Sequence, residues 1–97
     1  KSGNDILAYF YFDQNSGVAK FVMSHLVNDD RVYNMSDADL LVYLQEEHDT
    51  TYVNNVSNQT YFNVVDKNIA TGDTIYYAGA VYDAEGNHTI IRTTYAK

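Results

Sequence analysis

The segment from Thr74 to Asp83 limits the fold more than any other part of the sequence, because its side chains alternate along its whole length. One set of alternate residues comprises Ile75, Tyr77, Gly79 and Val81, and the other comprises Tyr76, Ala78, Ala80 and Tyr82. Successive side chains of a β-strand point to opposite faces, so we predict a long strand here. The turn-forming residues 83–87 and the run 89–95 complete a predicted hairpin.

Three earlier segments, 5–13, 18–27 and 59–65, are rich in β-branched and aromatic residues and lie between polar turn clusters. The turn cluster 14–17 ends in a glycine, so we predict that the first two segments form a hairpin. Turn signals roughly every 8–12 residues are typical of a sandwich or barrel. We therefore predict an all-β fold, a single antiparallel sandwich of about seven strands over residues 1–97.

The middle of the chain is open to two interpretations. The pattern Ser36-Asp-Ala-Asp39 is typical of a helix N-terminal capping box, with Asp in place of the usual Glu or Gln. The apolar residues that follow, 40–44, fit either one helix face or a buried strand, since periodicity does not separate the two in so short a run. We interpret 39–47 as a strand, because the rest of the chain is strongly β. The alternative is an α+β domain with a helix at 36–48.

Composition narrows the classes of function. Thirteen Asp and Glu residues against six Lys and Arg give a formal net charge of −7. This charge does not suit the phosphate backbone of nucleic acids or an anionic membrane surface. No apolar run approaches the roughly 18 residues of a membrane helix, so no membrane insertion is expected. The sequence has no cysteine, which excludes disulfides and thiolate metal sites and fits a bacterial surface or secreted protein, or a cytosolic one.

The stretch 68–87 reads NIATGDTIYYAGAVYDAEGN. An apolar residue precedes a turn with Gly and Asp, an alternating strand with Tyr near its start follows, and a hairpin comes next. In this outline the stretch resembles the corner before the penultimate strand of fibronectin type III and immunoglobulin-like domains. The residues that carry the resemblance are Ile69, Gly72, Asp73, Thr74 and Tyr76 or Tyr77.

The resemblance implies a tyrosine corner, in which a Tyr hydroxyl bonds to the backbone a few residues upstream and fixes the crossing between two sheets. Tyr76 is the first candidate for this role and Tyr77 the second. The resemblance also implies a binding or spacer module beside neighbouring domains of a parent chain, since bacterial relatives commonly belong to cell-surface adhesins and polysaccharide-degrading enzymes. We therefore expect a bacterial protein that is extracellular or on the cell surface.

Tyrosine, with ten residues, supplies the candidate binding site. Sugars stack their apolar C–H faces on aromatic rings, while Asn, Asp and Gln bond their hydroxyls. Tyr9 and Tyr11 share one strand face, and Tyr33, Tyr52 and Tyr61 lie near Asn- and Asp-rich loops. We predict a site that binds polysaccharide or a surface protein, with the pair Tyr33 and Tyr52 preferred. The alternative is a structural spacer or protein–protein interaction module, with buried tyrosines and termini at opposite ends.

The pattern does not predict an enzyme. Ser24 and His25 are neighbours on a predicted strand and therefore point to opposite faces, which excludes a dyad between them. We expect no cofactor. Asp29, Asp30 and Asp83 carry the oxygen atoms that Ca²⁺ prefers, but ordinary turn chemistry explains Asp at such positions, so no metal site is predicted.

Overall fold

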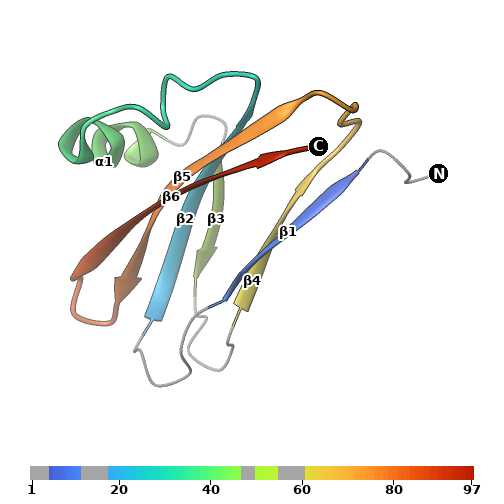
Figure 1. Cartoon of the computed structure of the whole chain (residues 1–97). Coiled ribbons are helices and arrows are strands. Elements are labelled where there is room, and N and C mark those ends of the chain that lie inside the picture. Colours follow the sequence, from blue (N-terminus) through green and yellow to red (C-terminus); the bar gives the residue numbers. More distant parts are fainter. Residues whose placement is uncertain (1–4, 12–17, 47–49, 55–60) are drawn as a thin grey trace.

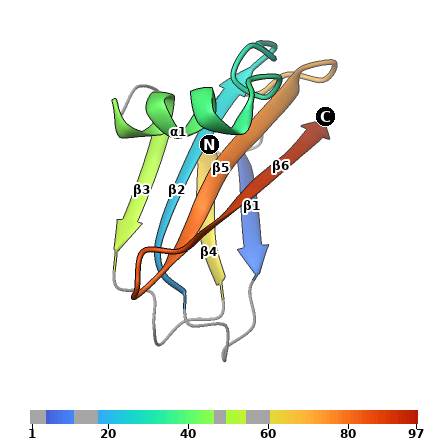
Figure 2. The ribbon, with the colours of Figure 1, turned by 90° about the vertical axis from the view of Figure 1, so that its left-hand side faces the viewer.

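The computed structural model describes residues 5–11, 18–46, 50–54 and 61–97, without the side chains of Val18 and residues 51–54. Its elements pack in three layers, with a small sheet on one side, a large sheet in the middle and a helix on the other side (Figures 1 and 2). The elements are β1 (Ile6–Tyr11), β2 (Val18–Val27), α1 (Asp37–Gln45), β3 (Thr50–Asn54), β4 (Tyr61–Asp66), β5 (Thr74–Asp83) and β6 (His88–Ala96).

Both sheets are antiparallel. The small sheet consists of β1 and β4, with Ile6 opposite Asp66 at one end and Tyr11 opposite Tyr61 at the other. The large sheet has the strand order β3-β2-β5-β6. The prediction of a hairpin between 5–13 and 18–27 is therefore wrong: β1 pairs with β4 and β2 pairs with β3 and β5. Turn residues indicate where the chain reverses, but they do not decide which strands become hydrogen-bonded neighbours.

The first core lies between the two sheets, where alternate residues of the facing strands meet. From the large sheet come Phe21 and Met23 of β2 with Ile75 and Tyr77 of β5, and all four are buried. From the small sheet come Phe62 and Val64, and Ile69 follows β4. This burial of apolar area is the main term that holds the sheets together.

The second core lies on the opposite face of the large sheet, beneath α1. Leu40 and Leu44 are four residues apart, so they lie on one face of the helix and are buried against the sheet. The sheet presents small residues there, Ala78 and Ala80, together with Val22. Small side chains let the helix approach closely, which explains why β5 carries alanines on this face.

The interpretation of 39–47 as a strand is wrong, and the helix alternative is the correct one over residues Asp37–Gln45. Ser36 is the N-cap, and its side chain accepts a hydrogen bond from the backbone N–H of Asp39 at 3.2 Å. The capping pattern was thus the informative signal, while the β character of the other segments was misleading. The fold is β-rich with two antiparallel sheets and one helix in the described residues.

Both described ends of the chain lie at the same end of the molecule. Asp5 accepts a hydrogen bond from the backbone N–H of Asn68, and the backbone C=O of Lys97 accepts one from the N–H of Gly72. The connection between β4 and β5 therefore contacts the segments before β1 and after β6 (Figure 1).

Candidate functional site

The outer face of the small sheet carries a cluster of exposed aromatic side chains. Alternate residues of β1 and β4 point away from the large sheet, and we call the resulting surface the tyrosine face. Its members are Leu7, Tyr9, Tyr11, Tyr61, Asn63 and Val65. The exposed fractions of Tyr9, Tyr11 and Tyr61 are 47%, 75% and 44%. The sheet therefore presents three large rings to solvent.

The three rings are mutual neighbours. The ring centroids of Tyr9 and Tyr61 are 5.7 Å apart, and each of these two rings lies 6.0 Å from that of Tyr11. The register explains this arrangement, because Tyr11 lies directly opposite Tyr61 and Tyr9 lies two residues away on the same strand face. The interplanar angles are 33°, 69° and 44°, so the rings form a faceted cluster rather than a flat platform.

The polar groups of the tyrosine face are uncharged. Three phenolic hydroxyls and the side-chain amide of Asn63, which lies opposite Tyr9, can both donate and accept hydrogen bonds. The remaining members, Leu7 and Val65, are apolar and lie opposite each other. The face therefore combines apolar area with uncharged hydrogen-bonding groups.

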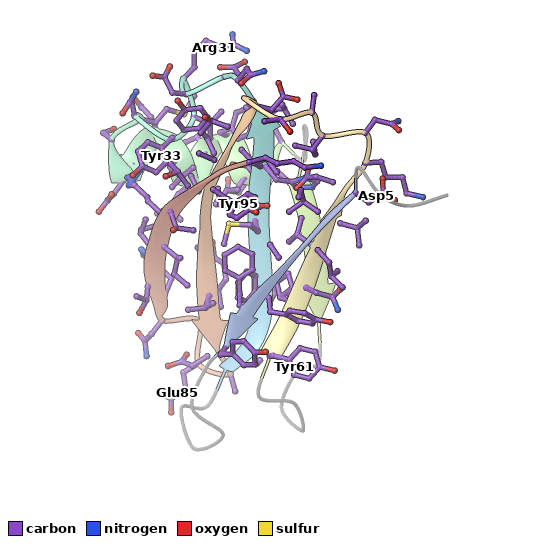
Figure 3. All side chains as sticks on the ribbon, turned by 45° about the vertical axis from the view of Figure 1, so that its right-hand side comes forward. Asp5, Arg31, Tyr33, Tyr61, Glu85 and Tyr95 are labelled. Atoms are coloured by element: carbon purple, nitrogen blue, oxygen red, sulfur yellow. The ribbon has the colours of Figure 1, made fainter. Side chains whose placement is uncertain are left out.

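Only part of the predicted binding set comes together here. Tyr9 and Tyr11 share an exposed face as expected, but Tyr33 packs its ring against Tyr76, with centroids 5.6 Å apart, beside the start of α1. Figure 3 shows Tyr33 and Tyr61 at opposite ends of the molecule. Tyr52 lies in β3 opposite Val22, and its side chain is outside the described residues.

The sequence placed Tyr61 near a polar loop, but Tyr61 was not in the predicted binding set. It lies at the start of β4, and its place beside Tyr9 and Tyr11 depends on the pairing of β1 with β4, in which Tyr11 and Tyr61 are 50 positions apart in the sequence. The alternation of 59–65 indicated a strand with Tyr61 on the face opposite Phe62. Nothing local indicated the partner strand, so the cluster is a product of the tertiary fold.

A buried polar bridge lies at the other end of the space between the sheets. The carboxylate of Asp66 in β4 accepts a hydrogen bond from the hydroxyl of Tyr77 at 3.3 Å and lies 2.7 Å from Nδ1 of His25. Tyr77 and His25 are directly opposite each other in β5 and β2, so both reach the same carboxylate. Burial, with the nearby Asp66 charge as a second cause, raises the pKa of Tyr77 well above its ordinary value.

Known proteins give no guide to this site. Comparison of the chain with family models, curated proteins and solved structures finds no match.

The tyrosine that joins the two sheets is Tyr77, the second of the two corner candidates. Its hydrogen-bond acceptor is the side chain of Asp66, eleven residues upstream, where the resemblance implied a backbone group a few residues away. Tyr76 lies on the opposite face of β5 and contacts Tyr33. Tyr77 therefore links the two sheets through a carboxylate, and this contact differs from the backbone contact that the resemblance implied.

Two of the three acidic residues considered for Ca²⁺, Asp29 and Asp83, have their oxygens engaged in local structure. Asp29 forms a salt bridge of 2.8 Å with Arg31, and this hydrogen-bonded partner lowers the pKa of Asp29. Asp83 accepts hydrogen bonds from the backbone N–H groups of Glu85 and Asn87 in the β5–β6 turn. Asp30 is exposed. Within the described part of the chain, no group of three or more His, Cys, Asp or Glu side chains could hold a metal ion.

The Ser24 hydroxyl donates to the backbone C=O of Ala78 at 2.7 Å, on the helix side of the large sheet. Because His25 instead faces Asp66 between the sheets, Ser24 and His25 point to opposite faces, as predicted. A search of the described residues also finds no helix whose length and apolar character would let it cross a membrane.

Proposed function

We propose that this domain is a non-catalytic accessory module of a larger extracellular bacterial protein and that it binds a neutral glycan on the tyrosine face. The observation that carries the proposal is the cluster of Tyr9, Tyr11 and Tyr61, whose rings are within 6.0 Å of one another and are exposed. A buried tyrosine would have favoured a purely structural role.

The chemistry of the tyrosine face matches that of a sugar. A sugar ring has apolar C–H faces that pack on aromatic rings and hydroxyls at its edge that need hydrogen-bond partners. Tyrosine offers both kinds of contact from one side chain, since its ring is apolar and its hydroxyl is polar. The amide of Asn63 adds a donor and an acceptor beside Tyr9.

Charge favours a neutral ligand. The six members of the tyrosine face are uncharged and the chain has a net charge of −7, so an acidic polysaccharide would approach against repulsion without a cationic partner on this surface. Plant or microbial glucans and related uncharged chains avoid this cost.

The placement of the chain ends argues against a simple spacer. Asp5 and Lys97 both bond to the connection between β4 and β5, so the chain enters and leaves at the same end of the domain. A spacer in a linear array needs its connections at opposite ends. Tyr61 lies at the far end of the small sheet from Asp5 (Figure 3), and Tyr11 lies opposite Tyr61 in the strand register. A domain joined at the Asp5 end would leave both tyrosines accessible.

The finer fold class that we propose is the immunoglobulin-like sandwich. In that fold strands B and E are neighbours in one sheet, and strands G, F, C and C′ follow one another in the second. The pairing of β1 with β4 corresponds to B with E, and the order β6-β5-β2-β3 corresponds to G-F-C-C′. The sequence order of the strands agrees with this correspondence as well.

Affinity electrophoresis of the isolated domain through gels that contain soluble neutral polysaccharides tests the proposal. We expect retardation by at least one neutral polysaccharide and none by an acidic one such as polygalacturonate. Tyr11→Ala is the first variant, because its side chain is the most exposed of the three and its loss leaves the core intact. It is expected to weaken binding about tenfold, the loss of one stacked ring.

Tyr95→Ala is the matched control, since Tyr95 of β6 is also exposed, at 46%, but is not a member of the tyrosine face. It is expected to retain wild-type retardation. If no neutral polysaccharide retards the wild-type domain, or if Tyr95→Ala and Tyr11→Ala lose binding equally, the proposal is wrong.

A further inference from the structure

The inner face of β6 is uncovered. Its residues Thr89, Ile91, Thr93 and Tyr95 lie opposite Val81, Gly79, Tyr77 and Ile75, so they share the face of the large sheet that packs on the small sheet. Yet Thr89, Thr93 and Tyr95 are exposed and Ile91 is only half-buried, whereas Ile75 and Tyr77 on the adjacent strand are fully buried. Figure 3 shows Tyr95 on this side of the large sheet. The large sheet thus extends one strand, β6, beyond the part that the small sheet covers.

The two strands of the small sheet differ in how well their inward residues are covered. Phe62, Val64 and Asp66 of β4 are buried, while Ile6, Ala8 and Phe10 of β1 are only half-buried. The ring of Phe10 lies 5.3 Å from that of Tyr77, so β1 sits over β5 rather than over β6. The gap in the first core is therefore beside β1 and above β6.

The edge of β1 is open to another strand. Among the described residues β1 pairs with β4 alone, so one side of its backbone has no strand partner. The sequence of β1, ILAYFY, contains none of the charged residues or prolines with which sheet edges prevent pairing. A strand added here would bond to the β1 backbone and would place alternate side chains over Ile91, Thr93 and Tyr95.

We propose that this edge accepts an extended peptide strand from a partner protein, with small apolar side chains at alternate positions and Lys or Arg at its ends. The apolar positions complete the first core above β6, and the main-chain bonds to β1 supply affinity, as in other cases of strand addition. Basic ends follow from the net charge of −7. The same charge disfavours a second copy of this chain as the occupant, because like-charged copies repel each other.

The probe is the synthetic peptide Lys-Lys-Thr-Val-Ser-Val-Thr-Val-Lys-Lys with blocked ends, titrated into the ¹⁵N-labelled domain. We expect amide shift changes in β1 and β6 and little change in β3. The matched control peptide has the same sequence with N-methyl groups at alternate residues, which removes the N–H donors that face β1. It is expected to bind at least about tenfold more weakly.

Two neighbouring residues of β6 provide matched protein variants. Thr93 lies on the uncovered inner face and Thr94 lies on the opposite face, and both are exposed, so lysine at either position adds the same charge to the same strand. We expect Thr93→Lys to weaken the peptide at least about tenfold and Thr94→Lys to change it by less than about twofold.

Three results would overturn the proposal. The first is the absence of β1 shift changes at saturating peptide. The second is an equal loss of binding in both lysine variants. The third is concentration-dependent dimerisation of the domain that Thr93→Lys abolishes, because the occupant would then be a second copy of this chain.

Discussion

His25 of β2 and Asp66 of β4 join the two sheets, with 2.7 Å between Nδ1 of the histidine and Oδ1 of the carboxylate. The side chain of Asp66 is buried and also accepts the hydroxyl hydrogen bond of Tyr77. A carboxylate in an otherwise apolar interior is stable only when its oxygens have partners. The pair therefore fixes the small sheet to the large one at a defined position.

Removal of the carboxylate is expected to destabilise the fold. Asp66→Ala leaves the hydroxyl of Tyr77 and the ring nitrogen of His25 without this acceptor, so the free energy of unfolding should fall by about 2–3 kcal/mol. Urea unfolding at neutral pH measures this change. Asp30→Ala is the control, since the exposed Asp30 side chain should contribute less than about 0.5 kcal/mol. Equal effects of the two substitutions would contradict the structural role of the bridge.

We expect the free energy of unfolding to fall at alkaline pH because of Tyr77. Burial raises the pKa of Tyr77 well above its ordinary value of about 10, so the folded state holds the phenolic proton more tightly than the unfolded state. The resulting stabilisation is complete below about pH 10 and is lost as the pH rises from there toward the folded pKa.

Tyr77→Phe removes this titration and the hydrogen bond to Asp66. The variant should be about 1 kcal/mol less stable than the wild type at neutral pH, and the difference should shrink above about pH 10. Chemical unfolding at intervals between neutral pH and about pH 12 gives the comparison. A difference that stays constant over this range would show that Tyr77 is not coupled to unfolding.

We expect that the centre of β5 does not tolerate a side chain in place of Gly79. A Cβ atom at this position would overlap the carbonyl oxygen of Val22 and lie 2.8 Å from Cα of Met23, and neither backbone atom can move easily. Gly79→Ala should lower the free energy of unfolding by about 2–3 kcal/mol.

Gly86→Ala separates crowding from backbone strain. A Cβ atom at Gly86 meets no atom within 4 Å, although its φ of 91° is unfavourable for alanine. Its cost should be about 1 kcal/mol and therefore smaller than that of Gly79→Ala. The opposite order would contradict the packing of β2 against β5 at this position.

We expect the stability of α1 to depend on its N-cap residue, Ser36. Ser36→Ala removes the acceptor for the backbone N–H of Asp39 and should cost about 1 kcal/mol. Ser36→Asp retains an acceptor and should keep the stability within about 0.5 kcal/mol of wild type. Thermal unfolding followed by far-ultraviolet circular dichroism measures both variants. Equal losses in the two would mean that the cap does not stabilise the helix.

The helix shows why local composition was insufficient in the middle of the chain. The five residues Leu40–Leu44 fit a strand or a helix face equally well, and the choice between them was made by the surface available for burial. The small residues Ala78 and Ala80 form a face of the large sheet on which Leu40 and Leu44 pack. Those residues are nearly 40 positions away in the sequence, so the apolar run 40–44 does not contain this information, and Ser36 at the N-cap was the local signal for the helix.

The tyrosine face was predicted in part for the same reason. Alternation along β1 put Tyr9 and Tyr11 on one face of the strand. It did not decide whether that face points to the core or to solvent. The pairing of Tyr11 with Tyr61, and the burial of Phe10 against Tyr77 and Phe21, decided that the tyrosines face solvent. Tyr33 is not part of this cluster, because its ring packs against Tyr76 on the opposite face of β5.

By itself the sequence determined the strands β1, β2, β4, β5 and β6, the β5–β6 hairpin and the two-sided character of these strands, because period-two alternation and turn residues act over a few neighbouring positions. Only the tertiary structure decided that β1 pairs with β4 and not with β2, and that Asp66 contacts His25 and Tyr77. It also decided that the small sheet does not cover β6. The pairing of β1 with β4 and the contact of His25 with Asp66 join residues about 40 or more positions apart, and the contact of Asp66 with Tyr77 and the uncovered part of β6 depend on which strands face each other across the two layers. A chain acquires these features only when its sheets pack.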